Sequence, residues 1–483
     1  MTLADLHNLI PYMLLSMGAC FLLLVGAFMR KPGPWALNIL GAIIALAAGV
    51  SAICIQPSRA EIGNLLTYDA FGRFFTAASS FMACISLLFA SGYSTRRPIG
   101  GEEFPSLALF AAFGMSLLAS STSLLGVFLG LESMSLSLYV MLAANKSDPL
   151  SGEAGLKYLI VGAISTAFFA YGLALIYADS GTLSLADSVS ALSGGTGAAK
   201  ISGIGLAGWA MLIVGLGFKT SLFPFHLWAP DVYQGGPAPT VGFISTASKA
   251  SVFAVFLKFT GAVGAPWSEL SRVLWVMAAL TMVFGNITAL TQNNIKRLLA
   301  YSSIAQMGYV LVALIAAPGS GQSSAIFYLV AYAAMELCAF GAISSFSGKD
   351  GELGDIRELR GAGFKYPLRS AALSIALVSL AGLPPTAGFI AKFGIFYSAM
   401  NSGYVWLSIT GILTAIVSVY YYLRVVVYLY MRGGEKIEKA AVFPAADIPS
   451  GIALAALSIT VVYLGIFPGK LLSLIASIAR LAV

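Results

Sequence analysis

The feature that most constrains this chain is its succession of long apolar runs, about fourteen in all. A membrane-spanning helix needs about 20 apolar residues, whereas the strands of an outer-membrane barrel alternate over about ten. With only 10% charged residues, the chain cannot supply a sizeable soluble domain. We therefore expect an all-α membrane protein of about 14 transmembrane helices. The runs are about 8–29, 34–56, 70–92, 104–121, 123–144, 156–178, 203–223, 239–258, 273–292, 298–316, 324–346, 370–399, 404–431 and 450–469.

The loop charges predict an orientation. Asp5 precedes the first run and Arg30 and Lys31 follow it, which is not the pattern of a cleaved signal peptide. Most loop lysines and arginines lie in the loops on the same side as Arg30, and cytoplasmic loops carry such an excess. We therefore predict that both termini are periplasmic. The net charge of +7 then reflects membrane orientation and does not indicate a nucleic-acid partner.

The sequence contains few residues that could bind a redox cofactor or a metal ion. The four cysteines lie far apart in apolar runs and form no CxxC, so they predict neither an iron–sulfur cluster nor a zinc site. The two histidines, His7 and His226, cannot ligate a haem pair. We expect no cofactor and no metal in this chain.

Two of the runs are interrupted. Pro224 and Pro230 follow Lys219 in the seventh run, and Pro384-Pro385 precede Lys392 in the twelfth. Proline removes a backbone donor and breaks or kinks a helix. Interrupted helices at matching places in two halves are typical of inverted-repeat transporters.

The two breaks lie five runs apart, and an odd repeat length inverts the second copy. We therefore predict two inverted five-helix repeats with discontinuous helices 7 and 12. The predicted units are three N-terminal helices in 1–103, repeat one with helices 4–8 in 104–260, repeat two with helices 9–13 in 261–431, and a C-terminal loop with helix 14 in 432–483.

Eight charged residues lie within the apolar runs. An ionised group in hydrocarbon costs on the order of several kcal/mol unless it is paired or reached by water. A chain that keeps so many, with so few charges overall, is best explained by ion or proton transfer. They are Arg73, Glu132, Lys157, Lys219, Lys249, Glu336, Lys392 and Arg424.

Five ionisable residues are candidates for proton transfer. Lys219 and Lys392 flank the two breaks, where unwound backbone and water would let a lysine hold or release a proton. Glu132 would bias Lys219 toward its charged form, and their separation would release the proton. Lys249 lies mid-run among small residues, and His226 could pass a proton on.

Each candidate also has a structural interpretation. Lys157 can equally well extend to the membrane surface, which is the preferred interpretation for Arg73. Arg424 is expected to anchor a helix end, Glu132 could be a structural acceptor, and His226 could be a structural residue of the Pro-rich turn. Glu336 has no evident partner, and its role stays open.

Three segments resemble a known family. They are FKTSLFPFHLWAPDVYQGGPAPTVGFISTASKA, NNIKRLLAYSSIAQMGY and SLAGLPPTAGFIAKF, and they are similar to the antiporter-like membrane subunits of respiratory complex I and of multisubunit cation/proton antiporters. The similarity runs from about residue 104 to 431. Lys392 stands where subunit M has glutamate, SVYYYLRVVVYLYM is typical of subunit N, and no long lateral helix follows the last run as in subunit L. The chain therefore resembles the subunit N family of bacterial NADH–quinone oxidoreductase.

The resemblance implies roles residue by residue. Glu132 matches the family's fifth-helix glutamate, which pairs with the lysine of the broken seventh helix, here Lys219. Lys249 matches the central lysine of the eighth helix, Lys392 the lysine toward the outer exit, and Lys157 a sixth-helix lysine. The implied activity is proton translocation by a subunit of an enzyme whose redox chemistry takes place elsewhere.

The resemblance also implies partners and a location. NADH, FMN, iron–sulfur clusters and quinone would be bound by other subunits, and this chain would contact membrane subunits, especially M and K, in the bacterial inner membrane. Two alternatives stay open. One is a subunit of a multisubunit Na⁺/H⁺ antiporter, and the other is a scaffold that does not pump.

Overall fold

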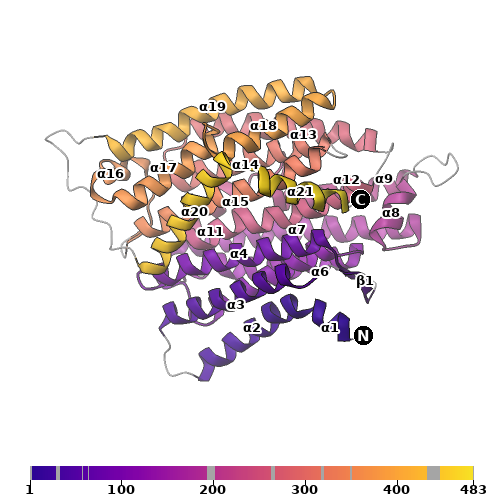
Figure 1. The fold of residues 1–483 in the computed structure, drawn as a ribbon, viewed down its shortest axis with the longest axis horizontal. Helices are drawn as coiled ribbons and strands as arrows, with labels where there is room; N and C mark the ends of the chain where they lie inside the picture. Colours follow the sequence, from indigo (N-terminus) through magenta and orange to yellow (C-terminus); the bar gives the residue numbers. More distant parts are fainter. Residues whose placement is uncertain are drawn as a thin grey trace.

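The structure is a computed structural model that describes residues 3–28, 33–56, 58–63, 65–192, 202–262, 267–316, 320–348, 351–431 and 447–481. Its long helices lie side by side with roughly parallel axes, as a bundle of membrane helices requires (Figure 1). Thirteen helices of the described chain are long and apolar enough to cross a membrane. The expected span at 370–399 is divided between two shorter helices, which together supply the fourteenth crossing. The predicted fold class is confirmed.

The elements follow one another in three groups. The N-terminal group is α1 (Leu3–Asn8), α2 (Ile10–Phe28), α3 (Pro34–Cys54), β1 (Ser58–Ile62), β2 (Leu66–Tyr68) and α4 (Ala70–Ser94). The middle group is α5 (Glu103–Ser120), α6 (Leu124–Leu142), α7 (Pro149–Ser180), α8 (Leu185–Leu192), α9 (Gly203–Thr220), α10 (Ala229–Gly235), α11 (Ala238–Phe243), the π-helix η1 (Ile244–Ser248) and α12 (Lys249–Ala262). The C-terminal group is α13 (Trp267–Leu290), α14 (Ile295–Ile315), α15 (Ser320–Phe346), the 3₁₀ helix η2 (Ile356–Leu359), α16 (Ala362–Lys365), α17 (Pro367–Ala381), α18 (Ala387–Asn401), α19 (Val405–Tyr430), α20 (Ile448–Ile466) and α21 (Gly469–Leu481).

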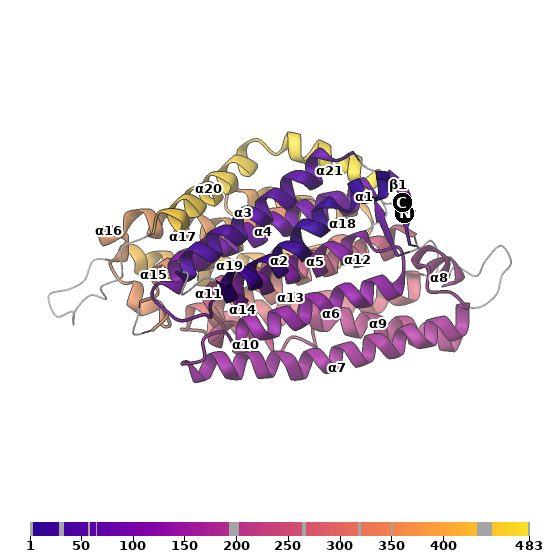
Figure 2. The ribbon, with the colours of Figure 1, turned by 90° about the horizontal axis from the view of Figure 1, so that it is seen from below.

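Loops that the predicted topology assigns to one side do meet at one end of the bundle. Arg96, after α4, pairs with Asp447, before α20, at 3.5 Å. Arg97 pairs with Asp148, before α7, at 2.9 Å. The first and last helices, α1 and α21, both lie at the opposite end (Figures 1 and 2). An even number of crossings produces this arrangement.

Both predicted breaks are present. The first separates α9 from α10 and begins at Ser221, whose φ is 60°. The second separates α17 from α18 and begins at Gly382, whose φ is 83°. Each half-helix thus ends on a residue in the left-handed region, which terminates the helical hydrogen-bond pattern.

Helix packing recurs in the two halves. In the first half α5 packs on α6 and α7 on α9, and in the second α13 packs on α14 and α15 on α17. Two copies of one unit would produce this pairing. The inverted relation of the copies and the unit boundaries stay predictions.

Two features differ from the expectation. The sixth span was expected to begin near residue 156, but α7 has 32 residues and begins at Pro149, because the Asp148 side chain caps it by accepting from the Leu150 amide. Its length of roughly 48 Å exceeds the roughly 30 Å of the hydrocarbon core. The β1–β2 hairpin between α3 and α4 was not expected, because its strands are short.

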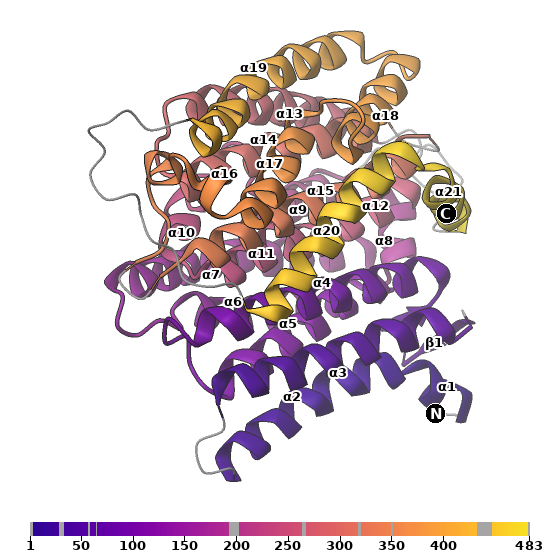
Figure 3. The ribbon, with the colours of Figure 1, turned by 60° about the vertical axis from the view of Figure 1, so that its left-hand side comes forward.

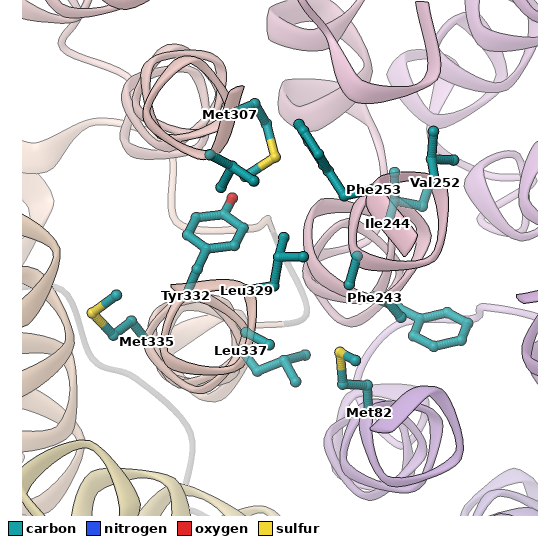
Figure 4. Packing of buried hydrophobic residues seen from close by; sticks show 14 of the residues in the cluster. Met82, Phe243, Ile244, Val252, Phe253, Met307, Leu329, Tyr332, Met335 and Leu337 are labelled. Atoms are coloured by element: carbon teal, nitrogen blue, oxygen red, sulfur yellow. The ribbon is translucent and has the colours of Figure 1, made fainter. Parts of the chain in front are cut away.

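The centre of the bundle is built by α11, η1, α12, α14 and α15, whose membrane segments are almost wholly buried. Figure 3 shows these helices between the N-terminal helices and the orange helices α17 to α19. Around α15, Leu337 lies toward Met82 of α4 and Tyr332 points toward Met307 of α14 (Figure 4). Lys249 and Glu336, which lie on these helices and are 0% exposed, are therefore far from lipid.

Candidate functional site

Lys219 lies in the last turn of α9, just before the first break, and only 3% of it is exposed. Its Nζ donates a hydrogen bond of 3.0 Å to the Tyr139 hydroxyl of α6. The same atom lies 5.1 Å from the centre of the Tyr139 ring and 5.4 Å from that of Tyr158. The ammonium is thus held by one hydroxyl and two aromatic faces, which attract a cation through their quadrupoles.

Glu132 is half-buried on α6 and accepts a 2.6 Å hydrogen bond from Thr166 Oγ1 of α7. It precedes Tyr139 by seven residues, a rise of roughly 10 Å along the helix. The Glu132 carboxylate acts on Lys219 electrostatically, but the two form no ion pair within 4 Å in the described chain. Glu132 and Lys219 therefore interact only through space, and Tyr139 is the residue that hydrogen-bonds Lys219.

Lys249 is fully buried at the start of α12, directly after the π-helix η1. Single π-turns are frequent at functional sites, and nothing in the composition predicted this one. Lys249 Nζ donates to Ser303 Oγ of α14 at 2.7 Å. Ser303 Oγ also lies 2.6 Å from the Tyr332 hydroxyl and 3.3 Å from that of Tyr233. Ser303 thus joins one lysine to two tyrosines from different helices.

Aromatic rings fill the space between Lys219 and Lys249. The Tyr158 ring lies 4.7 Å from the Trp228 ring, which lies 6.4 Å from the Tyr233 ring. Lys249 Nζ in turn lies 5.6 Å from the Tyr233 ring centre. Among the described residues no continuous series of hydrogen bonds connects the two lysines.

Lys392 lies on α18 and reaches back across the second break. Its Nζ donates to the carbonyls of Leu380 at 2.8 Å and Ala381 at 3.2 Å. These are terminal carbonyls of α17, where the helix dipole favours a positive charge. The ammonium of Lys392 thus binds carbonyls that lie at the break in the helix.

Polar side chains on α14 and α19 continue from Lys392 toward the centre. Gln306 Nε2 donates to the same Leu380 carbonyl at 3.3 Å and to the Tyr422 hydroxyl at 3.0 Å. Tyr422 hydrogen-bonds Ser302, and the Tyr328 hydroxyl donates to Gln306 Oε1. These residues were not singled out from the sequence. The polar string AYSSIAQMGY within an apolar run is a signal for Ser302 and Gln306, whereas Tyr328 and Tyr422 lie on other helices.

Two of the predicted site residues, Lys157 and His226, form no hydrogen bond with Lys219, Lys249, Lys392 or their partners in the described chain. Lys157 is 41% exposed and contacts Glu153 at 2.7 Å and Asp231 at 2.6 Å. Asp231 also binds Arg297 at 2.6 Å, so Lys157 belongs to a partly exposed ion cluster. His226 is buried, but its ring stacks 5.5 Å from that of Phe223 and its Nδ1 has no hydrogen-bond partner in the described chain.

The two arginines of the apolar runs, Arg73 and Arg424, are partly buried and cap helix ends. Arg424 Nη1 donates to the Leu290 carbonyl at the end of α13 at 3.3 Å, which confirms its expected anchoring role. Arg73 Nε donates to the Ala52 carbonyl near the end of α3 at 3.0 Å. In the described part of the chain, no three His, Cys, Asp or Glu side chains gather as a metal site would require.

Known proteins match this chain over nearly its whole length. The family model described as NADH:quinone oxidoreductase/Mrp antiporter, TM, matches residues 121–418. NADH-quinone oxidoreductase subunit N of Geotalea uraniireducens (strain Rf4) is 43% identical over 481 residues, which cover 99% of this chain and 100% of that relative. The chain belongs to the subunit N family of NADH–quinone oxidoreductase. It is thus a membrane-spanning subunit of an enzyme complex, as its motifs predicted.

Solved structures share the fold. A chain of respiratory complex I from Thermus thermophilus with bound aureothin is 33% identical, with a TM-score of 0.81, and the match covers 96% of this chain and 99% of that one. A chain of the Mrp complex from Dietzia sp. DQ12-45-1b is 19% identical, with a TM-score of 0.82 over 99% and 98% of the two chains. The second likeness shows the fold alone.

Proposed function

We propose that this subunit translocates protons across the bacterial inner membrane, driven by NADH-to-quinone electron transfer in other subunits. Unlike the buried Lys296, which pairs with Glu352, three lysines are buried without an ion-pair partner in the described structure, and they carry the proposal: Lys219, Lys249 and Lys392. Each hydrogen-bonds only to neutral hydroxyl or carbonyl oxygens in the described structure. None has a carboxylate within ion-pair distance there.

An unpaired ammonium in a low-dielectric interior is costly. Lysine can remove that cost by releasing its proton, and it can take the proton back when a negative charge approaches. Arginine cannot, because its guanidinium hardly deprotonates. The two arginines of the apolar runs cap helix ends, whereas all three central cations are lysines. This division supports a role in proton exchange.

The geometry suggests how the first step is controlled. Glu132 is half-buried and acts on Lys219 without touching it. A change of charge in an adjacent subunit would change the electrostatic attraction between Glu132 and the Lys219 ammonium. The lysine would then bind or release a proton. The proton would continue past the aromatic rings to Lys249 and leave by way of Lys392 toward the periplasm.

The proposal extends to partners. Subunits M and K are the expected neighbours, and NADH, FMN, iron–sulfur clusters and quinone are assigned to other subunits. A Na⁺/H⁺ antiporter subunit is less well supported, because the Mrp chain is 19% identical and the subunit N relative 43%. A scaffold that does not pump would not explain three lysines without ion-pair partners.

The test is Lys249→Arg in the assembled complex, reconstituted in vesicles. Arginine keeps the charge but cannot release the proton, so NADH-driven proton uptake should fall at least about tenfold. Proton uptake should fall equally in Lys249→Met, in which the methionine side chain matches the apolar stem of lysine. Lys157→Arg is the control, because its ion cluster needs only a positive charge, and it should pump normally. Wild-type proton uptake by a fully assembled Lys249→Met complex would refute the proposal.

A further inference from the structure

Glu336 is a buried acid that the proposed proton path does not yet use. It lies on α15 and is 0% exposed. Neither Oε1 nor Oε2 has a hydrogen-bond partner among the described residues. A buried carboxylate without donors is costly, and such unsatisfied groups in a native structure call for a reason. The Tyr332 hydroxyl, one turn earlier on α15, is near enough to interact with the carboxylate but makes no hydrogen bond of normal geometry with it, so a purely structural role is hard to assign.

Helix α15, which carries Glu336, lies in the centre of the bundle. It packs against α4, α11, η1, α14, α17, α18, α20 and α21. The charged side chain with which Glu336 interacts electrostatically is Lys249, from the junction of η1 and α12. The other ionisable groups under its influence are hydroxyls. They are Tyr233 of α10, Tyr328 and Tyr332 of α15, and Tyr422 of α19.

Glu336 lies where two hydrogen-bonded segments come close. The first runs from Lys249 through Ser303 to Tyr332, with distances of 2.7 and 2.6 Å. Tyr332 precedes Glu336 by four residues, so both side chains share one face of α15. In Figure 4 the Tyr332 ring points from α15 toward α14.

The second segment includes Lys392, the Leu380 carbonyl, Gln306 and Tyr422. No hydrogen bond within the described residues joins it to the first segment. Glu336 interacts electrostatically with Tyr332 of the first and with Tyr422 of the second. It is the acidic side chain common to both.

We propose that Glu336 is a proton-carrying residue that connects Lys249 to Lys392. The inference rests on the proposed function. In the first step the Lys249 ammonium loses a proton and becomes an amine, while the Glu336 carboxylate gains one and becomes a carboxylic acid. The two opposite charges disappear together, so the net charge of the pair stays zero. In the second step the acid passes its proton toward Lys392 and becomes a carboxylate again.

The charge balance explains why an acid is useful here. Moving a proton directly between two lysines would shift a full positive charge through a low-dielectric interior, at a high electrostatic cost. An acid between them divides the transfer into a neutralising step and a recharging step. The unsatisfied oxygens then belong to a group that changes protonation in each cycle.

The test is Glu336→Gln in the whole complex, reconstituted in vesicles beside the wild type. Glutamine keeps the shape but cannot carry the proton, so NADH-driven proton uptake should fall at least about tenfold. Glu336→Asp keeps the carboxyl group and should retain much of the uptake. Cys338→Ala is the matched control, since Cys338 is equally buried on α15 and donates weakly to the Ala372 carbonyl. It should pump as the wild type does.

A second readout separates proton transfer from folding. Infrared difference spectra of the complex, taken with and without NADH, should contain a carboxyl band that is absent in Glu336→Gln and shifted in Glu336→Asp. If the Glu336→Gln complex does not assemble, the spectrum of Glu336→Asp decides. A shifted carboxyl band supports the inference, and the absence of such a band overturns it. Normal uptake in Glu336→Gln with a defective Lys249→Met also overturns it and leaves the proposed function standing. Normal uptake in both variants refutes both.

Discussion

At the scale of single residues, Tyr139 is the direct partner of Lys219. Its hydroxyl accepts the hydrogen bond of Lys219 Nζ, and its ring meets the Tyr158 ring edge-on at 5.1 Å. Glu132 reaches Lys219 only through space, so the hydroxyl is the group that fixes the position of the ammonium. Without it, the ammonium would keep only its aromatic neighbours.

Tyr139→Phe should therefore weaken pumping several-fold and cost about 1–3 kcal/mol of stability, because it leaves a buried donor unsatisfied. Tyr158→Phe is the matched control. The Tyr158 ring also faces Lys219, but its hydroxyl has no partner in the described structure, so its removal should change little. Proton uptake and the midpoint of thermal unfolding measure both effects. Equal defects in the two variants would mean that the hydroxyl of Tyr139 does not hold Lys219.

The sequence could identify the buried charges but not their partners. Lys219, Lys249 and Lys392 were found because a charge within an apolar run is rare and costly. Tyr139 and Ser303 were missed, because hydroxyl side chains are common in membrane helices and their contacts come from distant helices. For Lys157 the sequence left a proton-transfer role and an extension to the membrane surface equally open, and the early start of α7 places it in a partly exposed ion cluster.

At the scale of elements, the side chain of Lys392 lies against the turn that forms the second break. Gly382 ends α17 with a φ of 83°, a conformation that a residue with a Cβ rarely adopts. A Cβ at this position would lie 2.9 Å from Lys392 Cδ. The turn and the lysine are therefore fitted to each other, and a side chain at 382 would disturb the hydrogen bonds to the Leu380 and Ala381 carbonyls.

Gly382→Ala tests this fit, with Gly403→Ala as the matched control. Both glycines have a positive φ, but nothing lies within 4 Å of a Cβ at Gly403, where φ is 85°. Each variant should lose about 1–2 kcal/mol through backbone strain, which thermal unfolding measures. Only Gly382→Ala should also reduce proton uptake, since only there must Lys392 move. An unchanged uptake at equal stability would show that Lys392 tolerates displacement.

Elements were predictable where a residue type enforces them. The breaks were predicted, because Pro224 and Pro384-Pro385 cannot continue a helix. The π-helix before Lys249 was not predicted, because the string ISTAS fits an α-helix equally well and the extra residue is accommodated by packing in the core. The ion cluster of Asp231 likewise depends on three helices whose contacts no local pattern reveals.

At the scale of the whole molecule, buried and exposed helices form distinct groups. The membrane segments of the central helices α14 and α15 are 94% buried, whereas those of α7 and α19 are only 28% and 33% buried. A single chain in a membrane can leave such outer helices to lipid, and a subunit can also offer them to its neighbours. The chain's membership of the subunit N family implies other complex I subunits as partners.

The last prediction concerns orientation. Arg96, Arg97 and Lys296 gather with their acidic partners at the end of the bundle opposite to α1 and α21. Since cytoplasmic ends carry the excess of lysine and arginine, we expect this end to be cytoplasmic and both termini periplasmic. Alkaline phosphatase fused after residue 483 should then be active, whereas green fluorescent protein fused at the same position should stay dark.

Truncation after α19 provides the internal control, because α20 is the crossing that returns the chain to the periplasmic end. Green fluorescent protein fused after Met431, with α20 and α21 removed, should therefore fluoresce, and alkaline phosphatase at that position should be inactive. Arg96 pairs with Asp447 and Arg97 pairs with Asp148, so the loops before α5 and α7 must share the side of the Met431 fusion. Fluorescence from the fusion after residue 483 would invert the whole assignment. Lys392 would then face the cytoplasmic half of the membrane, and the proposed direction of proton exit would have to be reversed.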